Sequence, residues 1–460
     1  MTALELDKES GISETACEPH LRHLRDLADS YRDFHRYEEA HKLRERICGI
    51  WKKFQPTGRA HIHAHRDLAM SFYDRRDYPK AMSILQKIVE IENNLVPQGQ
   101  IDHEDGDRLI SLSALARCYS ANGYEKEAKD AYQEVFEARR GKPHHDLFVA
   151  MQDLANSYSK LGNEADAYEL RQNIVKGFEY LGERISQKHP SLLAARFNLA
   201  RSLLTWDKVD EALELHRKVL ADRKALNQPD EYDLETVDSM LGVAFSYWRR
   251  ALRKVRGVGE VRGVDEEAEV ALQKGEAVAR ICQRKAASRN SPDIRQWFDR
   301  WNDVGKLQYE LKKYDCAIDT HCSVLAALGR DFKEDDDDML STLSLLAQNL
   351  FRRKGPKDLE QAVVFFKDII RLLREKLDVE EYGHPRLIDP YDWLARTLEK
   401  QGNKGNDYMA MYEEILAMRE RFHGKEAGYT KAAAERLASE YRSRKLKKKA
   451  KKLERDYGID

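Results

Sequence analysis

A two-residue motif, one large aliphatic residue followed by one small residue, recurs ten times along the chain. The small residue is Ala28, Ala69, Ala116, Ala155, Ala200, Gly242, Gly305, Ala347, Ala395 and Ala438. Successive copies lie 39 to 48 residues apart, except for one step of 63 residues between Gly242 and Gly305. Self-similarity at such a period is typical of a solenoid that stacks one helical unit many times.

A second small residue follows twelve positions after the first in seven copies. It is Ala40, Ala81, Ala128, Ala167, Ala212, Ala317 and Ala450. Two antiparallel helices approach closely only where both side chains are small, so we expect the two small residues of a copy to mark the contact between its helices A and B. Gly123, Gly162 and Gly402 stand seven residues after the first small residue and are expected to end helix A in the left-handed conformation.

This pattern resembles the tetratricopeptide repeat, in the long form of kinesin light chains and of fungal nucleotide-binding receptor proteins. In those families a His-Pro pair lies eleven residues before the first small residue, and His189-Pro190 and His384-Pro385 match that place. The resemblance covers about residues 19–450. It implies an all-α, right-handed superhelical solenoid of about ten antiparallel helix pairs with a concave groove. HEAT or armadillo repeats share the period but do not explain the twelve-residue alanine spacing.

Departures from the repeat divide the chain into five parts. We expect a disordered tail over 1–18, repeats one to five with the first helix of repeat six over 19–250, a basic glycine-containing insertion over 251–269, the remaining repeats up to the first helix of repeat ten over 270–442, and a basic capping helix with a tail over 443–460. The insertion is interpreted as a surface loop, with a lid over the groove as the alternative. The basic C-terminus is interpreted as a solvated cap, with a nuclear-import signal or a contact to an acidic partner as the alternatives.

The charge and the cysteines limit the class of protein. Lys and Arg number 79 against 80 Asp and Glu, so the net charge of -1 makes nucleic acid and a membrane surface unlikely partners. No window approaches the length of apolar chain that crosses a bilayer. Six cysteines without a CxxC pair favour a reducing compartment. We therefore expect a cytoplasmic protein, with nuclear access as an alternative.

The candidate binding site is the row of residues that helices A would present to the groove. If the first small residue faces helix B, positions three before, one after and four after it face the groove. The residues selected in this way are Arg66, Tyr73, Arg117, Asn156, Phe197, Arg201, Lys306, Tyr309, Gln348 and Arg396. Guanidinium and amide groups bind carboxylates and peptide backbone, and the aromatic rings could hold an apolar anchor. The alternative is that these polar residues only solvate an exposed helix face.

Two short runs contain the residue types of a metal site. His61 and His65 are one helical turn apart, but zinc requires three or four ligands and no fourth is evident. Asp335 to Asp338 resemble a magnesium cluster, but Asp336 falls at the place of His189 and Asp338 at a helix N-terminus, where carboxylates accept backbone amides. We expect no cofactor and no metal, with His61, His65, Asp335 and Asp338 as weak candidates.

The sequence therefore favours a non-catalytic scaffold or adaptor that binds a protein segment, with acidic character, along the groove. One alternative is an enzyme or accessory protein of small-molecule metabolism that uses the superhelix interior as a pocket. Another is the sensor fragment of a signalling receptor, although the phosphate-binding string GxxxxGK[ST] of a nucleotide-binding domain does not occur. The partner and the oligomeric state do not follow from these patterns.

Overall fold

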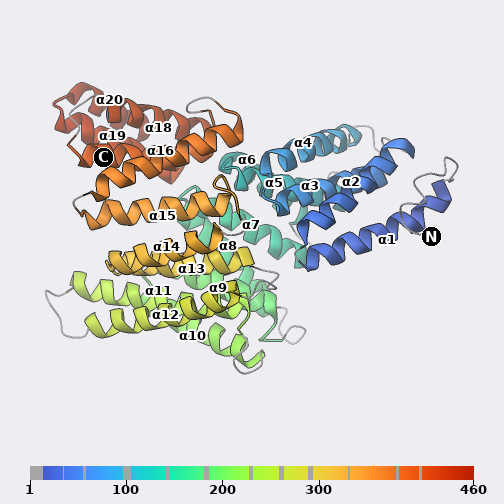
Figure 1. The fold of residues 1–460 in the computed structure, drawn as a ribbon, viewed down its shortest axis with the longest axis horizontal. Helices are drawn as coiled ribbons and strands as arrows, with labels where there is room; N and C mark the ends of the chain where they lie inside the picture. The colour runs from blue at the N-terminus through green and yellow to red at the C-terminus, as the bar shows by residue number, and fades with distance from the viewer. Residues whose placement is uncertain are drawn as a thin grey trace. The chain divides into compact units, whose positions relative to one another are not determined.

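The structure is a computed structural model that describes residues 14–34, 36–54, 59–96, 105–140, 145–180, 186–226, 232–257, 264–287, 294–329, 332–355, 357–379, 383–402 and 407–459. These residues form consecutive α-helices joined by turns, without a strand, which confirms the predicted all-α solenoid (Figure 1). The chain divides into two compact units, residues 1–122 with 130–139 and residues 123–129 with 140–460. None of the described helices combines the length and the apolar character needed to cross a membrane.

The helices alternate between types A and B of the repeat. Helices A are α1 (Glu14–Asp33), α3 (Arg59–Asp74), α5 (Gly106–Ala121), α7 (His145–Lys160), α9 (Pro190–Thr205), α11 (Leu234–Gly257), α13 (Ile294–Glu310), α15 (Asp337–Arg353), α17 (Ile388–Lys400) and α19 (Gly428–Ser443). Helices B are α2 (Tyr37–Phe54), α4 (Tyr78–Leu95), α6 (Glu125–Arg139), α8 (Glu164–Tyr180), α10 (Val209–Leu226), α12 (Val264–Ala287), α14 (Tyr314–Leu328), α16 (Asp358–Leu377), α18 (Asp407–His423) and α20 (Lys447–Tyr457). A 3-10 turn, η3 (Pro385–Leu387), precedes α17. Of the expected tail 1–18, residues 1–13 lie outside the described residues, and α1 begins at Glu14.

The small residues lie at the contacts between helices, as the spacing predicts. Each alanine of the first set is 0% exposed, and each alanine of the second set is at most 1% exposed. Where the twelve-residue spacing fails after Ala347, Ala362 takes the same role three residues later and is also 0% exposed. Methyl groups at these points let the two helix backbones approach, and neighbouring apolar side chains interdigitate around them.

The residue seven positions after the first small residue adopts a left-handed backbone in nearly every described repeat. The predicted glycines have positive φ, at 83° for Gly123, 79° for Gly162 and 73° for Gly402. Five residues with side chains take the same conformation at the same place, namely Arg76, Asp207, Lys312, Lys354 and Lys445. The A-to-B turn therefore imposes this conformation even where the sequence does not supply the glycine that adopts it without strain.

Two repeats have glycine instead of alanine at the first small position, and in both a buried histidine occupies the space. A Cβ on Gly242 would lie 2.9 Å from His216 Nε2, and a Cβ on Gly305 would lie 2.4 Å from His321 Cε1. Both histidines are 0% exposed and belong to helices B, α10 and α14. His216 Nδ1 lies 2.9 Å from Ser246 Oγ, and His321 Nδ1 lies 3.0 Å from Asn302 Oδ1. These glycines are therefore required by volume rather than by backbone conformation.

Where the structure describes it, the long step in the repeat is helical. The expected insertion over 251–269 lengthens the two helices of repeat six, so that α11 and α12 are each 24 residues long. Residues 258–263 between them lie outside the described residues. Helix extension is possible because the added segments on both sides of the glycines are rich in charged residues and alanine, which favour helix over loop.

In four repeats the residue eleven positions before the first small residue caps the start of helix A or, for His384, the turn η3 that precedes it. His189 Nδ1 accepts the Ser191 amide at 3.3 Å, and His384 Nδ1 accepts the Arg386 amide at 3.2 Å. Asp105 and Asp336 take the same role, with the Asp107 and Asp338 amides donating to them, each at 3.0 Å. The His-Pro signature is thus one version of an N-cap, for which either an imidazole nitrogen or a carboxylate is a suitable acceptor.

The second unit contains contacts between segments that are far apart in the sequence. At the turn between α7 and α8, the Leu161 carbonyl lies 3.5 Å from the Tyr429 amide of α19, and a Cβ on Gly428 would lie 2.8 Å from the Gly162 oxygen. The Tyr124 ring packs edge-on against His384, with 5.2 Å between ring centroids, and against Phe422. The solenoid of this unit therefore turns far enough for its first turns to touch repeats nine and ten. The sequence contains no periodic signal for this contact.

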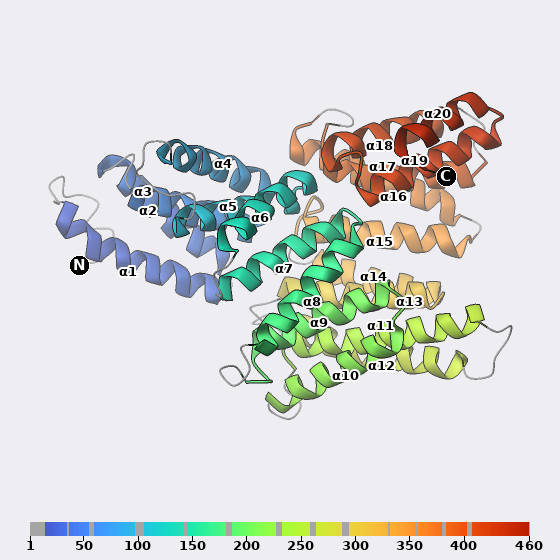
Figure 2. The same cartoon turned by 180° about the vertical axis from the view of Figure 1, so that it is seen from behind.

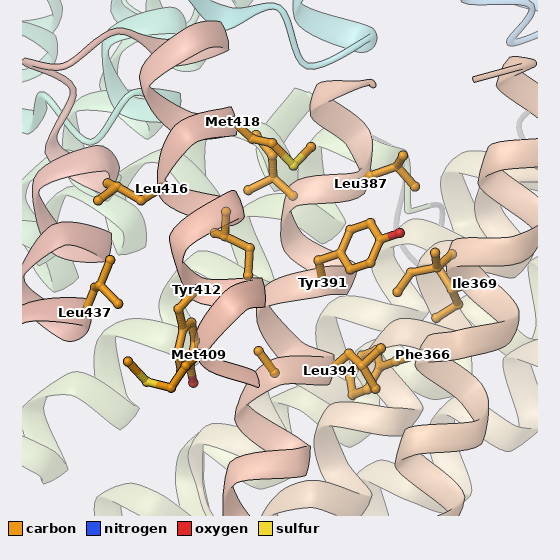
Figure 3. Close-up of a cluster of buried hydrophobic side chains, with 14 of the residues drawn as sticks. Phe366, Ile369, Leu387, Tyr391, Leu394, Met409, Tyr412, Leu416, Met418 and Leu437 are labelled. Atoms are coloured by element: carbon orange, nitrogen blue, oxygen red, sulfur yellow. The ribbon is translucent and has the colours of Figure 1, made fainter. Parts of the chain in front are cut away.

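The C-terminal helices of the second unit share a continuous apolar core (Figure 3). Phe366 of α16 is 0% exposed, and Leu394 of α17 and Leu416 of α18 are each 6% exposed. The last helix, α20, closes this core with Ala450 and Tyr457, which are 1% and 9% exposed. One side of α20 is thus apolar and buried, and the other is polar and exposed.

Candidate functional site

The ten residues predicted for the groove are divided between the two units. In the first unit, Arg66 is largely buried and donates to the Asp107 carbonyl at 3.0 Å, which ties α3 to α5. Tyr73 packs edge-on against Tyr78 with 5.2 Å between ring centroids. Arg117 is exposed, and its guanidinium lies 4.0 Å from Met70 Sδ. Arg66 therefore stabilises the stacking of two repeats, and Arg117 keeps its guanidinium at the surface.

Several predicted residues of the second unit are bonded to their neighbours. Asn156 Oδ1 accepts from Gln152 and Arg171, and Gln348 donates to Ser344 at 3.2 Å. Lys306 and Arg396 form ion pairs one turn apart, at 2.7 Å to Asp303 and 2.6 Å to Asp392. Tyr309 accepts from Arg352 Nε at 2.8 Å. These contacts fit the alternative interpretation, in which polar residues satisfy one another on a solvated helix face.

Two of the predicted residues, Phe197 and Arg201, line the same cavity in the second unit. The cavity has a volume of about 650 Å³ and is formed by α9, α11 and α13, which lie side by side (Figures 1 and 2). Its lining consists of Phe197, Arg201, Leu204, Thr205, His216, Asp238, Leu241, Gly242, Phe245, Trp248, Arg249, Arg300 and Asp303. Seven of these thirteen residues are polar or charged, so the cavity combines apolar rings with charged groups and suits a side chain or a small ligand that has both characters.

The charged groups of the cavity differ in how they are engaged. Arg300 donates to both carboxylate oxygens of Asp238, at 2.9 Å each, and this pair raises the pKa of Arg300 despite its burial. Arg249 donates to the Leu204 carbonyl at 3.1 Å and lies over the Trp248 ring. Arg201 is exposed and makes no hydrogen bond or ion pair with any residue of the described ranges. The cavity therefore offers one guanidinium group, that of Arg201, which has no partner in the described ranges and is available to a ligand.

His216 stands at the wall of the cavity in its neutral form. Burial, together with the charges of Arg201 and Arg223, lowers the pKa of His216 to about 4. Ser246 Oγ donates to the Gly242 carbonyl at 2.8 Å, so we assign the Nδ1 proton to His216, which donates it to Ser246. The imidazole thus contributes shape and no charge at neutral pH.

Sequence reasoning found one helix of this cavity and missed the others. Phe197, Arg201 and Leu204 of α9 follow the predicted positions relative to Ala200. On α11 the lining residues include Asp238, Leu241 and Phe245, which lie one or two residues before the predicted positions around Gly242. Gly242 leaves room for the His216 and Phe197 rings, each of which a Cβ would meet at 2.9 Å. The aromatic residues Phe245 and Trp248 were a usable signal, because two large rings close together on one helix are typical of a binding surface.

The weak metal candidates are engaged in structural contacts. The His61 and His65 rings lie 4.0 Å apart, and the His61 carbonyl lies 3.0 Å from His65 Nδ1. Asp338 pairs with Arg295 at 2.7 Å, and Asp335 offers its backbone carbonyl to Lys376 at 3.0 Å. Within the described ranges, no three His, Cys, Asp or Glu side chains are grouped so that they could hold a metal ion.

The aspartates of this run instead bind cations of neighbouring helices. Asp337 lies 2.9 Å from Lys376 of α16 and 2.5 Å from Arg386 of η3. The charges of Arg386 and Lys376 keep the pKa of Asp337 below its usual range despite the burial of the carboxyl. The carboxylates at the start of α15 thus cap the helix and link it to the repeats on both sides.

Comparison with known proteins gives neither a family nor a curated relative. No family model matches the sequence, and no curated protein matches it. Among solved structures, a putative kinesin light chain of Podosopora anserina with nearly identical TPR-like repeats is 25% identical, with a TM-score of 0.40, over 46% of this chain and 98% of that one. A tetratricopeptide repeat protein from Parabacteroides merdae is 12% identical, with a TM-score of 0.43, over 72% and 98% of the two chains. Human IFIT1, as a dimer with m7Gppp-AAAA, is 14% identical, with a TM-score of 0.45, over 85% and 80%.

Proposed function

We propose that this protein is an interaction scaffold whose second unit binds a protein segment of acidic character at the cavity between α9, α11 and α13. This proposal is carried by exposed Arg201, which has no partner in the described ranges and lies at a cavity lined by both apolar and charged side chains. A helical solenoid presents its side chains on rigid elements, so such a site needs little reorganisation on binding.

The charges around the cavity favour a carboxylate over a cation. Asp238 is already occupied by Arg300, and Asp303 by Lys306. Within the residues that the structure describes, Arg201 and the backbone-bound Arg249 remain as positive charge without a carboxylate partner. A guanidinium binds a carboxylate with two parallel hydrogen bonds, which is the strongest contact available to an exposed side chain here.

The walls of the cavity favour an apolar anchor next to that carboxylate. Leu241 is buried, and Phe197, Phe245 and Trp248 are partly exposed along the rim. Aromatic residues and arginine together are the composition of the energetically dominant positions of protein interfaces. We therefore expect a segment that combines an aliphatic or aromatic side chain with Asp or Glu nearby.

The test measures, by fluorescence anisotropy, how tightly two labelled peptides bind to the whole 460-residue chain. One peptide carries leucine and tryptophan flanked by Asp and Glu, and the other has Lys in place of every acid. We expect the acidic peptide to bind and Arg201→Glu to weaken it about 10- to 100-fold, because a hydrogen bond to a charged group contributes about 1.5–3 kcal/mol.

The matched control is Lys218→Glu, which reverses the charge of an exposed residue on α10 outside the cavity lining. It should leave the affinity unchanged, which separates the local contact from the net charge. If the acidic peptide binds Arg201→Glu as tightly as the native protein, or if both peptides bind equally, the cavity is not the acidic-peptide site.

A further inference from the structure

The last helix of the second unit carries a stripe of positive charge. Lys448, Lys451, Lys452 and Arg455 of α20 are spaced i, i+3, i+4 and i+7, which places them on one side of the helix. All four are exposed, with Arg455 80% exposed. Ala450 and Tyr457 occupy the opposite side and are buried in the core. The position of α20 is therefore determined by its apolar side, and the basic side has no packing role.

Three of the four cations of the stripe have no ion-pair partner in the described ranges, whereas Arg455 Nε lies 3.8 Å from Asp456 Oδ1. Elsewhere, helix surfaces carry ion pairs one turn apart, such as Arg371 with Glu375 at 3.4 Å. Lys448, Lys451 and Lys452 make no hydrogen bond or ion pair with any residue within the ranges that the structure covers. Like charges at i and i+4 destabilise a helix by about 0.2–0.5 kcal/mol per pair. The three unpaired lysines on one side of α20 form a local concentration of positive charge that suits a partner of opposite charge.

The surroundings of the stripe favour one class of polyanion. The apolar side of α20 is buried, so it has no face to insert into a bilayer. The tyrosines closest to it in sequence, Tyr441 and Tyr457, are 7% and 9% exposed, so the stripe offers no ring on which an unpaired base could stack. The lysine ammonium is a compact charge that binds phosphate well. The cavity at α9 instead presents arginine, whose guanidinium can form two parallel hydrogen bonds with a carboxylate. The phosphates of a duplex need no apolar face, no ring for stacking and no bidentate guanidinium, so a duplex is the polyanion that fits this surface.

We propose that the α20 stripe binds the phosphate backbone of double-stranded nucleic acid without reading its sequence. The net charge of -1 does not predict such a partner. It sums over the whole chain, and the positive charge of α20 is balanced by acidic residues elsewhere. A rigid helix presents its four cations over two turns, which matches a backbone contact and leaves base edges untouched. The surface is separate from the residues of the α9–α11–α13 cavity, and this inference is independent of the proposed peptide site.

The test is the binding of a fluorescein-labelled DNA duplex of about 20 base pairs to the full-length protein over a range of salt concentrations. Three to four phosphate contacts predict a slope of log K against log salt between about -2.7 and -3.6, because each contact contributes about -0.9. Two duplexes of unrelated sequence should bind equally. The variant K448Q/K451Q/K452Q/R455Q should bind more than about tenfold more weakly at 50 mM salt, roughly the low-salt limit of such measurements.

The matched control removes four exposed lysines that are scattered over α2, α4, α8 and α10. It is K42Q/K87Q/K176Q/K218Q, which changes the net charge equally and should keep duplex binding. Circular dichroism melting should show both variants folded, since glutamine and lysine have similar helix propensity. Unchanged binding by the stripe variant overturns the proposal. Tighter binding of single strands, of phosphatidylserine vesicles or of a polyglutamate peptide than of the duplex overturns it equally.

Discussion

Replacing Gly305 by alanine tests the idea that a glycine at the first small position makes room for a buried histidine. The new methyl carbon would lie 2.4 Å from His321 Cε1 and 2.6 Å from Nε2. His321 is 0% exposed and is bonded through Nδ1 to Asn302 Oδ1, so its ring cannot turn away freely. We therefore expect Gly305→Ala to destabilise the second unit, although alanine is the better helix former.

The magnitude follows from three opposing effects. Overfilling a packed core costs about 1–3 kcal/mol. Displacing the imidazole weakens a buried hydrogen bond, which costs about 1 kcal/mol. Alanine in place of glycine within a helix recovers about 1 kcal/mol. The net loss is about 1–3 kcal/mol, or a fall in Tm of about 2–6 °C for a unit of this size.

The measurement combines thermal unfolding with amide hydrogen exchange of α13 and α14. Gly49→Ala is the control, because a Cβ there meets nothing within 4 Å in the middle of α2, and it should stabilise the first unit by about 0.5–1 kcal/mol. Adding His321→Ala to Gly305→Ala should cost less than the sum of the two single changes, because the clash disappears with the ring. A Gly305→Ala protein as stable as the native one, or strictly additive costs, would refute the steric explanation.

Two further predictions concern acidification and the long-range contact of the second unit. Burial lowers the pKa of His216, His321 and His384 to about 4, whereas histidine in the unfolded chain titrates near 6.5. The unfolded chain therefore binds more protons between these values, so the free energy of unfolding should decrease as the pH is lowered from about 6.5 to 4, by up to about 1.4 kcal/mol per pH unit for each histidine. Urea midpoints measured at several pH values would show this decrease. A profile that is flat over this range contradicts the burial of neutral rings. Gly428→Ala would place a Cβ 2.8 Å from the Gly162 oxygen, so amide exchange at 159–163 and 428–430 should accelerate. Exchange that matches the native protein at both segments would show that these turns do not touch in solution.

The repeated contacts of the fold could be predicted from the sequence because they are local. Ala28 and Ala40 are twelve residues apart, and every such pair is encoded by its own spacing without knowledge of the rest of the chain. The left-handed turns after Gly123, Gly162 and Gly402 were predictable for the same reason. The same conformation at Arg76 or Lys354 was not, because these residues adopt it only when the packing of both helices requires it.

The candidate site was predictable only in part. The repeat register selected Phe197 and Arg201, which line one cavity, since α9 has the alanine that defines the register. It selected Asn156, Lys306 and Arg396 by the same rule, but their neighbours already satisfy them. Whether an arginine in this row finds a partner depends on the side chains of the adjacent repeat. The position of one repeat relative to the next is not encoded in either repeat alone.

The sequence alone determined that neighbouring helices pair, which faces they bury and where each turn begins, because these properties depend on short spacings. Only the tertiary structure decided that repeat six extends its helices, that Asp337 binds Lys376 and Arg386, and that Leu161 meets Tyr429. The last contact depends on small rotations accumulated over many repeats, and no local pattern of residues records their sum.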